Sequence, residues 1–232
     1  MKKTILLLSS FLIVSTATLA QNTAKAKEVL PKKTEVMETA PEVVFDSIHF
    51  QKSAEMLDET IYWELIDKTV KANLSQEDQE LFLTNELEKL SPKEIIGFRL
   101  RTDKLLFDSY TSDLWCAAYI MNGGTTDGGF DYFRCWIISK GKEAYYNALA
   151  NPDSLINLVK DGQNAYEFEG FWFVAMNAFL NKTDHEIYNF IDYDTFVTND
   201  EHYPLLTFNW NVDEPKTMSK ICPVLFQKLW KN

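Results

Sequence analysis

The clearest helical signal in the chain is FEGFWFVAMNAF, residues 168–179. Apolar residues recur there at positions i, i+3, i+4, i+7 and i+11, a spacing that places them on one face of an α-helix: Phe168, Phe171, Trp172, Ala175 and Phe179. A second strong signal lies upstream, where Ser91 is followed by Pro92 and then by Glu94. This order is typical of a capped helix start. Both signals indicate that the core is built from helices.

Other segments carry weaker helical patterns. Apolar spacing, capping residues or glycine stops predict helices in residues 61–66, 75–90, 114–121, 130–137 and 153–160. In the first of these, Ile61, Leu65 and Ile66 are expected on one buried face. Strand signals are thin, because residues 203–210 alternate only weakly. We therefore predict a mainly α fold, a single compact helical domain with an aromatic-rich core and little or no strand.

The composition fits one folded domain behind an N-terminal extension. The 232 residues are 46% hydrophobic and 14% aromatic and include only 8 Gly and 7 Pro, which excludes a disordered or fibrous chain. Residues 21–44 contain no aromatic residue, so we predict a flexible leader there. All the aromatic residues but Phe11 fall in residues 45–232, where we predict the helical domain.

Residues 1–20 have the parts of a secretory signal peptide. Two lysines precede an apolar run from residue 5 to residue 14, and small residues end at Ala20, after which we expect cleavage. This apolar run is shorter than the roughly 20 residues that a spanning helix needs. We predict an exported protein, periplasmic or extracellular, with no membrane span after cleavage. Cleavage would change the net charge from −11 to −13, because it removes two lysines and no acid.

The charge and the cysteines narrow the possible partners. With 34 acidic against 23 basic side chains, a nucleic-acid partner is not expected, because phosphate binding needs clustered cations. Cys116, Cys135 and Cys222 either include one disulfide with one thiol left over, or are three buried thiols. The apolar neighbours of Cys116 and Cys135 favour buried thiols. No metal is expected, because no pair of cysteines has the spacing of metal ligands. No organic cofactor is indicated.

The central part of the chain carries a longer pattern. LWCAAYI at residues 114–120 is followed by Gly123-Gly124, Asp127 and YFRCWIIS at residues 132–139. This pattern resembles a bacterial family known as domain of unknown function 4240. Further landmarks of that family occur in the same order: YWELI at 62–66, LSP at 90–92, NPDSL at 151–155 and CPVL at 222–225. The resemblance covers about residues 58–230.

The resemblance implies a shared fold but no activity, because that family has no established one. Its members often carry two adjacent acids before the phenylalanine, whereas Asp127 is followed here by Gly128-Gly129. A role that needs the acidic pair is therefore not carried over to this chain.

The glycine-rich loop at residues 122–129 is the centre of a candidate functional patch. Asp127 either caps the next helix, the favoured interpretation, or contacts a ligand. Arg134 is either buried and paired with a carboxylate, which is favoured, or turned outward. We expect Arg134 to organise the inner face of the loop, with four candidate partners: Asp127, Asp131, Glu167 and Glu169.

Two further pairs belong to this patch. Glu167 and Glu169 either stabilise the first turn of the following helix or form an acid/base pair of the kind that cleaves glycosides. Trp115 and Tyr119 are four residues apart. Together with the other clustered aromatic residues they either pack in the core, which their helical spacing favours, or line a groove for a sugar or peptide. Those other residues are Tyr62, Trp63, Tyr132, Trp136 and Trp172.

No catalytic motif of a serine hydrolase is present, and the acidic surface suits a basic partner. We therefore expect a protein-binding or inhibitory module more than an enzyme. One alternative is a carboxylate-based hydrolase that uses the acids near residues 122–134. Another is a scaffold with no ligand pocket. Convergence of the acids with Arg134 in one pocket would favour the hydrolase.

Overall fold

The computed structural model of the protein describes residues 51–230. These residues form nine α-helices and three short 3-10 helices: α1 (Glu59–Lys71), α2 (Gln76–Leu87), α3 (Pro92–Asp108), α4 (Ser112–Asn122), α5 (Asp127–Ser139), α6 (Lys142–Ala150), η1 (Pro152–Leu158), α7 (Glu169–Thr183), η2 (Ile187–Phe190), η3 (Asp200–His202), α8 (Pro215–Ile221) and α9 (Pro223–Leu229). Within residues 51–230 there is no β-strand, and two isolated bridges join Ser53 to Ile191 and Asn211 to Glu214. The predicted mainly α fold is confirmed.

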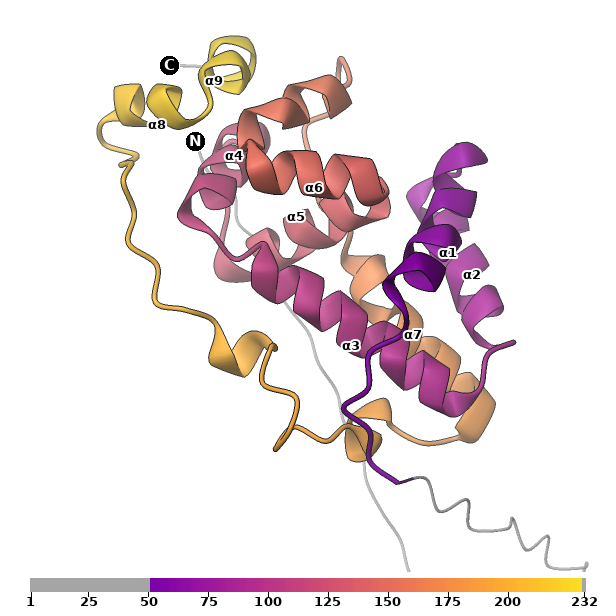
Figure 1. Ribbon diagram of the computed structural model, residues 1–232. Coiled ribbons are helices and arrows are strands. Elements are labelled where there is room, and N and C mark those ends of the chain that lie inside the picture. Colours follow the sequence, from indigo (N-terminus) through magenta and orange to yellow (C-terminus); the bar gives the residue numbers. More distant parts are fainter. Residues whose placement is uncertain (1–50, 231–232) are drawn as a thin grey trace, which may run out of the picture. The chain divides into compact units, whose positions relative to one another are not determined.

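Helix α7 lies at the centre of the packing and contacts α2, α3 and α5. Its buried face contains the predicted residues Phe171, Ala175 and Phe179, together with Val174 and Ala178. Figure 1 shows α7 behind α3, with α1 and α2 beside them. The apolar stripe that is clearest in the sequence therefore faces three other helices.

The helices enclose one core that is rich in aromatic side chains. The largest fully buried rings are those of Trp136, Tyr62, Tyr145, Tyr166, Phe98 and Phe130. Each such side chain removes a large apolar area from water, which makes these rings a major source of folding free energy. The predicted aromatic-rich core is confirmed.

Local capping signals set several helix ends as predicted. The Ser91 hydroxyl accepts a hydrogen bond from the Glu94 amide at 3.3 Å, and the Glu94 carboxylate accepts one from the Ser91 amide at 2.8 Å. Ser75 caps α2 by accepting from the Asp78 amide at 3.1 Å. Gly123 ends α4 with φ at +67°, a left-handed conformation that glycine adopts without steric cost.

Several local expectations are corrected. Leu65 and Ile66 are buried as expected, but Ile61 is 44% exposed, because it lies outside the face of α1 that buries them together with Tyr62 and Trp63. The predicted helix at residues 153–160 is the 3-10 helix η1. Helix α6 was not predicted, since it buries only Tyr145 and Ala148 and so has a weak apolar pattern.

The C-terminal part of the fold contains an extended segment. Residues 203–210 have neither helical nor strand pairing and run outside α3 and α4 towards α8 (Figure 1). Their weak sequence alternation therefore corresponds to an extended chain without a partner strand.

The predicted signal peptide and leader, residues 1–20 and 21–44, lie outside the described residues. Among residues 51–230, no helix has the length and apolar character needed to cross a bilayer.

Candidate functional site

The glycine-rich loop between α4 and α5 forms the floor of an open hollow on the surface. The hollow is lined by Tyr119 of α4, Tyr132 of α5 and Glu167, in addition to Gly123, Gly124, Thr125, Thr126, Gly128 and Gly129. A methyl group added at Gly123, Gly124 or Gly128 would meet no atom within 4 Å, so the loop backbone is accessible there. The structure thus brings Tyr119 and Glu167 of the predicted patch together at this loop.

Glu167 and Glu169 lie close together but differ in their surroundings. Burial and the charge of Glu169 raise the pKa of the Glu167 carboxyl above its usual range. The Glu169 carboxylate accepts a hydrogen bond from the Tyr132 hydroxyl at 3.0 Å. Glu169 begins α7, whereas Glu167 precedes the N-cap residue Phe168, so only Glu169 lies in the first turn of the helix. The expectation that both acids occupy that turn is corrected.

Asp127 and Asp131 do not join Glu167 in the hollow. Thr126, not Asp127, caps α5, because its hydroxyl accepts a hydrogen bond from the Gly129 amide at 3.2 Å. Asp127 is the first residue of the helix and is exposed. Asp131 turns towards Arg134 and forms an ion pair with it. Burial raises the pKa of Asp131, although Arg134 acts in the opposite direction.

Arg134 is fully buried and joins three parts of the fold. Its guanidinium donates to the Leu106 carbonyl of α3, the Tyr203 hydroxyl at 3.1 Å and the Phe130 carbonyl at 3.3 Å. It also lies 4.6 to 5.0 Å from the ring centres of Phe130, Tyr203 and Tyr110. The expected burial and carboxylate pairing are therefore present. The expected role at the inner face of the loop is corrected, because these contacts reach α3 and the C-terminal segment instead.

The predicted aromatic residues divide between core and surface. Tyr62, Trp63 and Trp136 are buried. Trp115, Tyr119, Tyr132 and Trp172 are half-buried. Trp115 packs against Phe130, with ring centres 4.4 Å apart, and lies away from the loop hollow, whereas Tyr119 lines it. Core packing accounts for most of this set, and Tyr119 and Tyr132 remain available at the hollow.

A separate pocket of about 320 Å³ was not predicted from the sequence. Its lining residues are Arg99, Asp103, Tyr188, Tyr193, Asp200 and Glu201. Arg99 and Asp103 are 3% and 5% exposed. The Asp103 carboxylate accepts hydrogen bonds from two guanidinium nitrogens of Arg99, at 2.7 and 3.2 Å. A buried ion pair at the base of a pocket lined by tyrosines and acids is a candidate binding site on physical grounds.

The buried ion pair is supported from the neighbouring helix. Arg99 also donates to the Trp172 carbonyl at 3.0 Å and stacks on the Trp172 ring at 4.4 Å. Burial raises the pKa of Asp103 to about 6, with Arg99 opposing the shift. The signal that could have located the pair is its i, i+4 spacing inside the apolar stripe of α3, where Ile95 and Leu106 are also buried.

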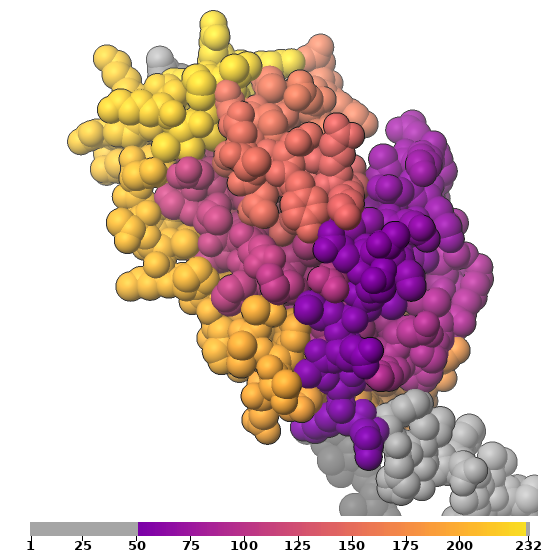
Figure 2. Space-filling model, viewed as in Figure 1, coloured from indigo at the N-terminus to yellow at the C-terminus, as the bar shows by residue number. Residues whose placement is uncertain are grey.

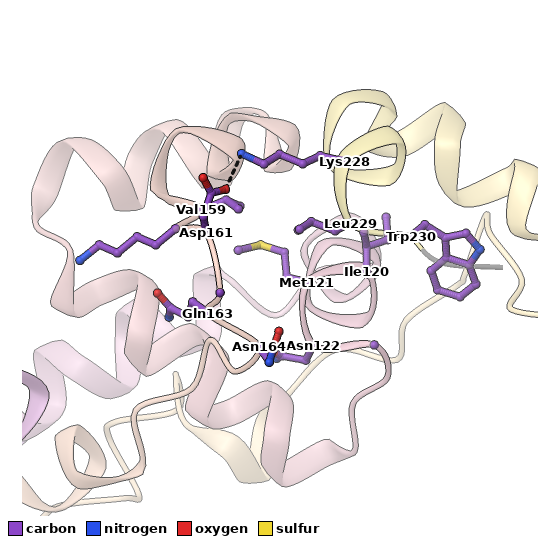
Figure 3. A pocket seen from close by; sticks show the side chains of 13 residues that line it. Ile120, Met121, Asn122, Val159, Asp161, Gln163, Asn164, Lys228, Leu229 and Trp230 are labelled. Carbon is purple, nitrogen blue, oxygen red and sulfur yellow. Dashed lines mark ion pairs between the residues drawn. The ribbon is translucent and has the colours of Figure 1, made fainter.

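A third hollow, of about 550 Å³, lies between the end of α4, residues 159–164 and α9 (Figure 3). Lys228 reaches across it to Asp161, with 3.8 Å between the charged atoms. The side-chain amide nitrogen of Asn122 and the indole nitrogen of Trp230 are buried without an acceptor among the described residues. None of the predicted acids lines this hollow, which shares only Asn122 and Gly123 with the predicted loop.

The described residues contain no group of three or more His, Cys, Asp or Glu side chains arranged to hold a metal ion. Cys116, Cys135 and Cys222 are all buried, as the apolar neighbours of the first two favour, and none of them is bridged in this structure. The predicted acids are therefore divided: Glu167 lines the loop hollow, Asp131 neutralises a buried arginine, and Asp127 lines neither of the two hollows beside the loop.

Comparison with known proteins gives a family and nothing more specific. No curated protein and no solved structure matches the chain. Residues 57–181, which include α1 to most of α7, match a protein family of unknown function, DUF4240. The match ends before the CPVL landmark at residues 222–225, so the resemblance expected over residues 58–230 is shorter at its C-terminal end. Because the match covers more than half of the chain, the protein belongs to the DUF4240 family.

Proposed function

We propose that the protein is exported and binds a basic protein through the segment between α7 and α8. The observation that carries this proposal is the charge of residues 183–215, which contain eight acidic residues and no Lys or Arg. Within the described residues none of the eight forms an ion pair, and seven of them are exposed. Unpaired acids concentrated in one segment attract a cationic surface and accelerate its association. We call residues 183–215 the acidic segment.

Apolar side chains are exposed along the same segment. Leu205 is 99% exposed, Val197 52% and Phe208 46%. The backbone N–H and C=O groups of residues 204–209 make no hydrogen bond to other described residues. Figure 2 shows the acidic segment in orange to yellow at the edge of the face in view. An extended backbone with unpaired polar groups and exposed apolar side chains suits a peptide that runs alongside it.

The pocket at Arg99 and Asp103 gives the partner an anchoring point. Asp200 and Glu201 of the acidic segment line it together with Tyr188 and Tyr193. A Lys or Arg side chain that enters the pocket would meet the carboxylates of Asp200 and Glu201 and the side chain of Tyr193. Carboxylates and aromatic rings both attract cations. Arg99 does not oppose this entry strongly, because Asp103 neutralises it.

The competing hydrolase has less support. A carboxylate pair must face one substrate position, with the two groups roughly 5 to 10 Å apart. Glu167 lines the loop hollow without Asp127 or Asp131, and Glu169 is bound by Tyr132. Arg134 is buried and bonded elsewhere. The geometry offers no shared cleft for the acids and the arginine.

The binding proposal is tested with a peptide rich in Lys and Arg, titrated by calorimetry or fluorescence anisotropy at low and moderate salt. We expect binding that weakens as salt rises, and a roughly tenfold loss of affinity in the double variant Asp200→Asn/Glu201→Gln, as for rim charges that steer and hold a partner. The matched control Glu64→Gln/Glu77→Gln removes the same charge from exposed positions outside the acidic segment and should lose much less. Equal losses in both variants, or no binding at low salt, would overturn the proposal.

Export is tested on its own. The protein is produced in its native host, and the mass of the mature chain is measured in the cytoplasmic and extracytoplasmic fractions. We expect a chain that begins at Gln21 outside the cytoplasm. An intact chain that is found only in the cytoplasm would contradict export and leave the peptide-binding result unaffected.

A further inference from the structure

Two of the three buried cysteines meet across a helix junction. Cys116 lies in the middle of α4, and Cys222 is the single residue between α8 and α9. The Cys116 sulfur is 3.9 Å from the Met218 carbonyl oxygen, and the Cys222 amide donates to that same oxygen at 2.9 Å. Both residues are fully buried, and α4 packs against both α8 and α9. The shared Met218 carbonyl therefore brings the two cysteines to the same place in the fold, although more than one hundred residues separate them in the sequence.

Cys135 differs from this pair. It lies on α5 beside Arg134, and no thiol contact to it occurs among the described residues. Burial raises the pKa of Cys135 to about 12 and also raises the pKa of Cys222, so position and not acidity separates Cys135 from the pair. Of the three pairings that three cysteines allow, the fold favours one.

We infer that Cys116 and Cys222 form a disulfide when the chain folds in an oxidising compartment, and that Cys135 remains a thiol. The inference rests on the proposed export for the compartment, and on the fold for the choice of pair. A bond at this position would tie the α8–α9 pair to α4. It would therefore fix the C-terminal end of the acidic segment, which the contact of Arg134 with Tyr203 also holds within its second half.

The chemistry is a thiol–disulfide exchange with a low-molecular-mass disulfide such as oxidised glutathione. The thiolate of one cysteine attacks a glutathione sulfur, and a mixed disulfide forms as one glutathione thiolate leaves. The thiolate of the other cysteine then attacks the protein sulfur of that mixed disulfide and releases the second glutathione. The two protons from the protein thiols end on the two glutathione thiols. Two protein thiols are oxidised and one glutathione disulfide is reduced.

The order of events follows from burial. Cys116 and Cys222 are both 0% exposed, so an oxidant cannot reach them in the folded state. The Cys116 side chain and burial also raise the pKa of Cys222, which keeps the reactive thiolate scarce. The bond must therefore close during folding, while α8 and α9 approach α4 and before their packing shields both thiols from the oxidant.

The test refolds the reduced full-length chain in a buffer of oxidised and reduced glutathione. Thiols are then counted after denaturation, and linked peptides are mapped by mass spectrometry. We expect one remaining thiol, a loss of the mass of two hydrogen atoms, and a linked pair of peptides that carry Cys116 and Cys222. The Cys135→Ala variant should form the same link and keep no thiol. The oxidised chain should melt several degrees above the reduced one, because the bond closes a long loop.

Three remaining thiols, or a link that includes Cys135, would overturn the inference. The same treatment of the already folded, reduced chain should form the link far more slowly, and equally fast oxidation would contradict the closing order. Neither a signal peptide nor a binding partner takes part in this assay. Its failure is therefore distinguishable from a failure of export or of peptide binding.

Discussion

Replacing Arg134 with leucine tests the central polar contact of the fold. The change removes the donor to the Leu106 carbonyl and to the Tyr203 hydroxyl, and the cation that pairs with Asp131. A buried polar group left unpaired costs about 1–3 kcal/mol, and breaking a buried ion pair costs about 3–5 kcal/mol. The Asp131 side chain is 29% exposed, so water can replace part of its interaction.

These contributions lead us to expect a loss of about 3 kcal/mol in the free energy of unfolding, the lower end of that range. For a domain of this size, about 1 kcal/mol corresponds to a shift of roughly 2–4 °C, so the melting temperature should fall by about 6–12 °C. Thermal melts followed by circular dichroism, together with urea unfolding at neutral pH, measure both quantities. Arg134→Lys keeps the charge but loses the planar fork, and should fall between leucine and wild type.

The matched control is Lys104→Leu on α3, which breaks the ion pair with Asp108 among side chains that are 32% and 38% exposed. Such a pair contributes about 0–1 kcal/mol, so this variant should melt close to the wild type. If Arg134→Leu melts together with Lys104→Leu, the guanidinium does not hold α3, α5 and the C-terminal segment together, and the reasoning is refuted.

Three other predictions concern single groups. The Asp103 carboxyl should titrate near pH 6 in carboxyl-carbon NMR, with Asp103→Asn for assignment, because burial outweighs its arginine partner. The folded chain then binds this proton more tightly than the unfolded chain, so the free energy of unfolding falls as pH rises from about 4 to 6. A titration midpoint of Asp103 below pH 4 would show that the ion pair with Arg99 outweighs burial. Gly141→Ala should lower the free energy of unfolding in urea by about 1–3 kcal/mol, since Gly141 has φ at +95°. The control Gly128→Ala should be neutral or stabilising, because an added methyl group at this position in α5 meets open space. Ser91→Ala should cost about 1 kcal/mol by losing its cap on α3, and an unchanged urea midpoint would contradict the role of that capping box.

Local signals predicted the fold where neighbouring residues decide the structure. The capping box at Ser91 and the glycine stop at Gly123 act within a few residues, and both are found as expected. Ile61 is different, since its burial depends on which face of α1 meets the other helices. Leu65 and Ile66 are buried beside Tyr62 and Trp63, and Ile61 lies outside that face. Apolar spacing alone does not show which apolar residue at the edge of a helix face stays exposed.

The candidate site was predictable only in part, because its pairings are set by tertiary structure. Sequence spacing offered four carboxylates to Arg134, and the fold selects Asp131, one turn away on the same helix. Glu167 reaches the glycine-rich loop from a position more than thirty residues downstream. The Arg99–Asp103 pocket needs the acidic segment to fold back over α3, and no local pattern in the sequence encodes that return.

The family match and the acidic segment occupy different parts of the chain, and this division bears on the proposed function. The match ends at residue 181, and the acidic segment begins two residues later. Buried apolar residues, among them Ile187, Ile191 and Phe196, attach the first half of the segment to the core. Two side chains attach the second half: Tyr203 accepts from Arg134, and the Trp210 indole donates to the Ser112 carbonyl at 2.8 Å. Neither anchor uses a carboxylate of the segment or the backbone of residues 204–209. Attachment and the proposed recognition therefore depend on different residues.

Tyr203→Phe should then lower the melting temperature and change the affinity for the basic peptide little. Asp200→Asn/Glu201→Gln should do the reverse: it should weaken peptide binding with little change in melting temperature. A loss of stability in the second variant as large as in the first would show that these acids help to hold the fold, and the proposal would lose its separate recognition surface.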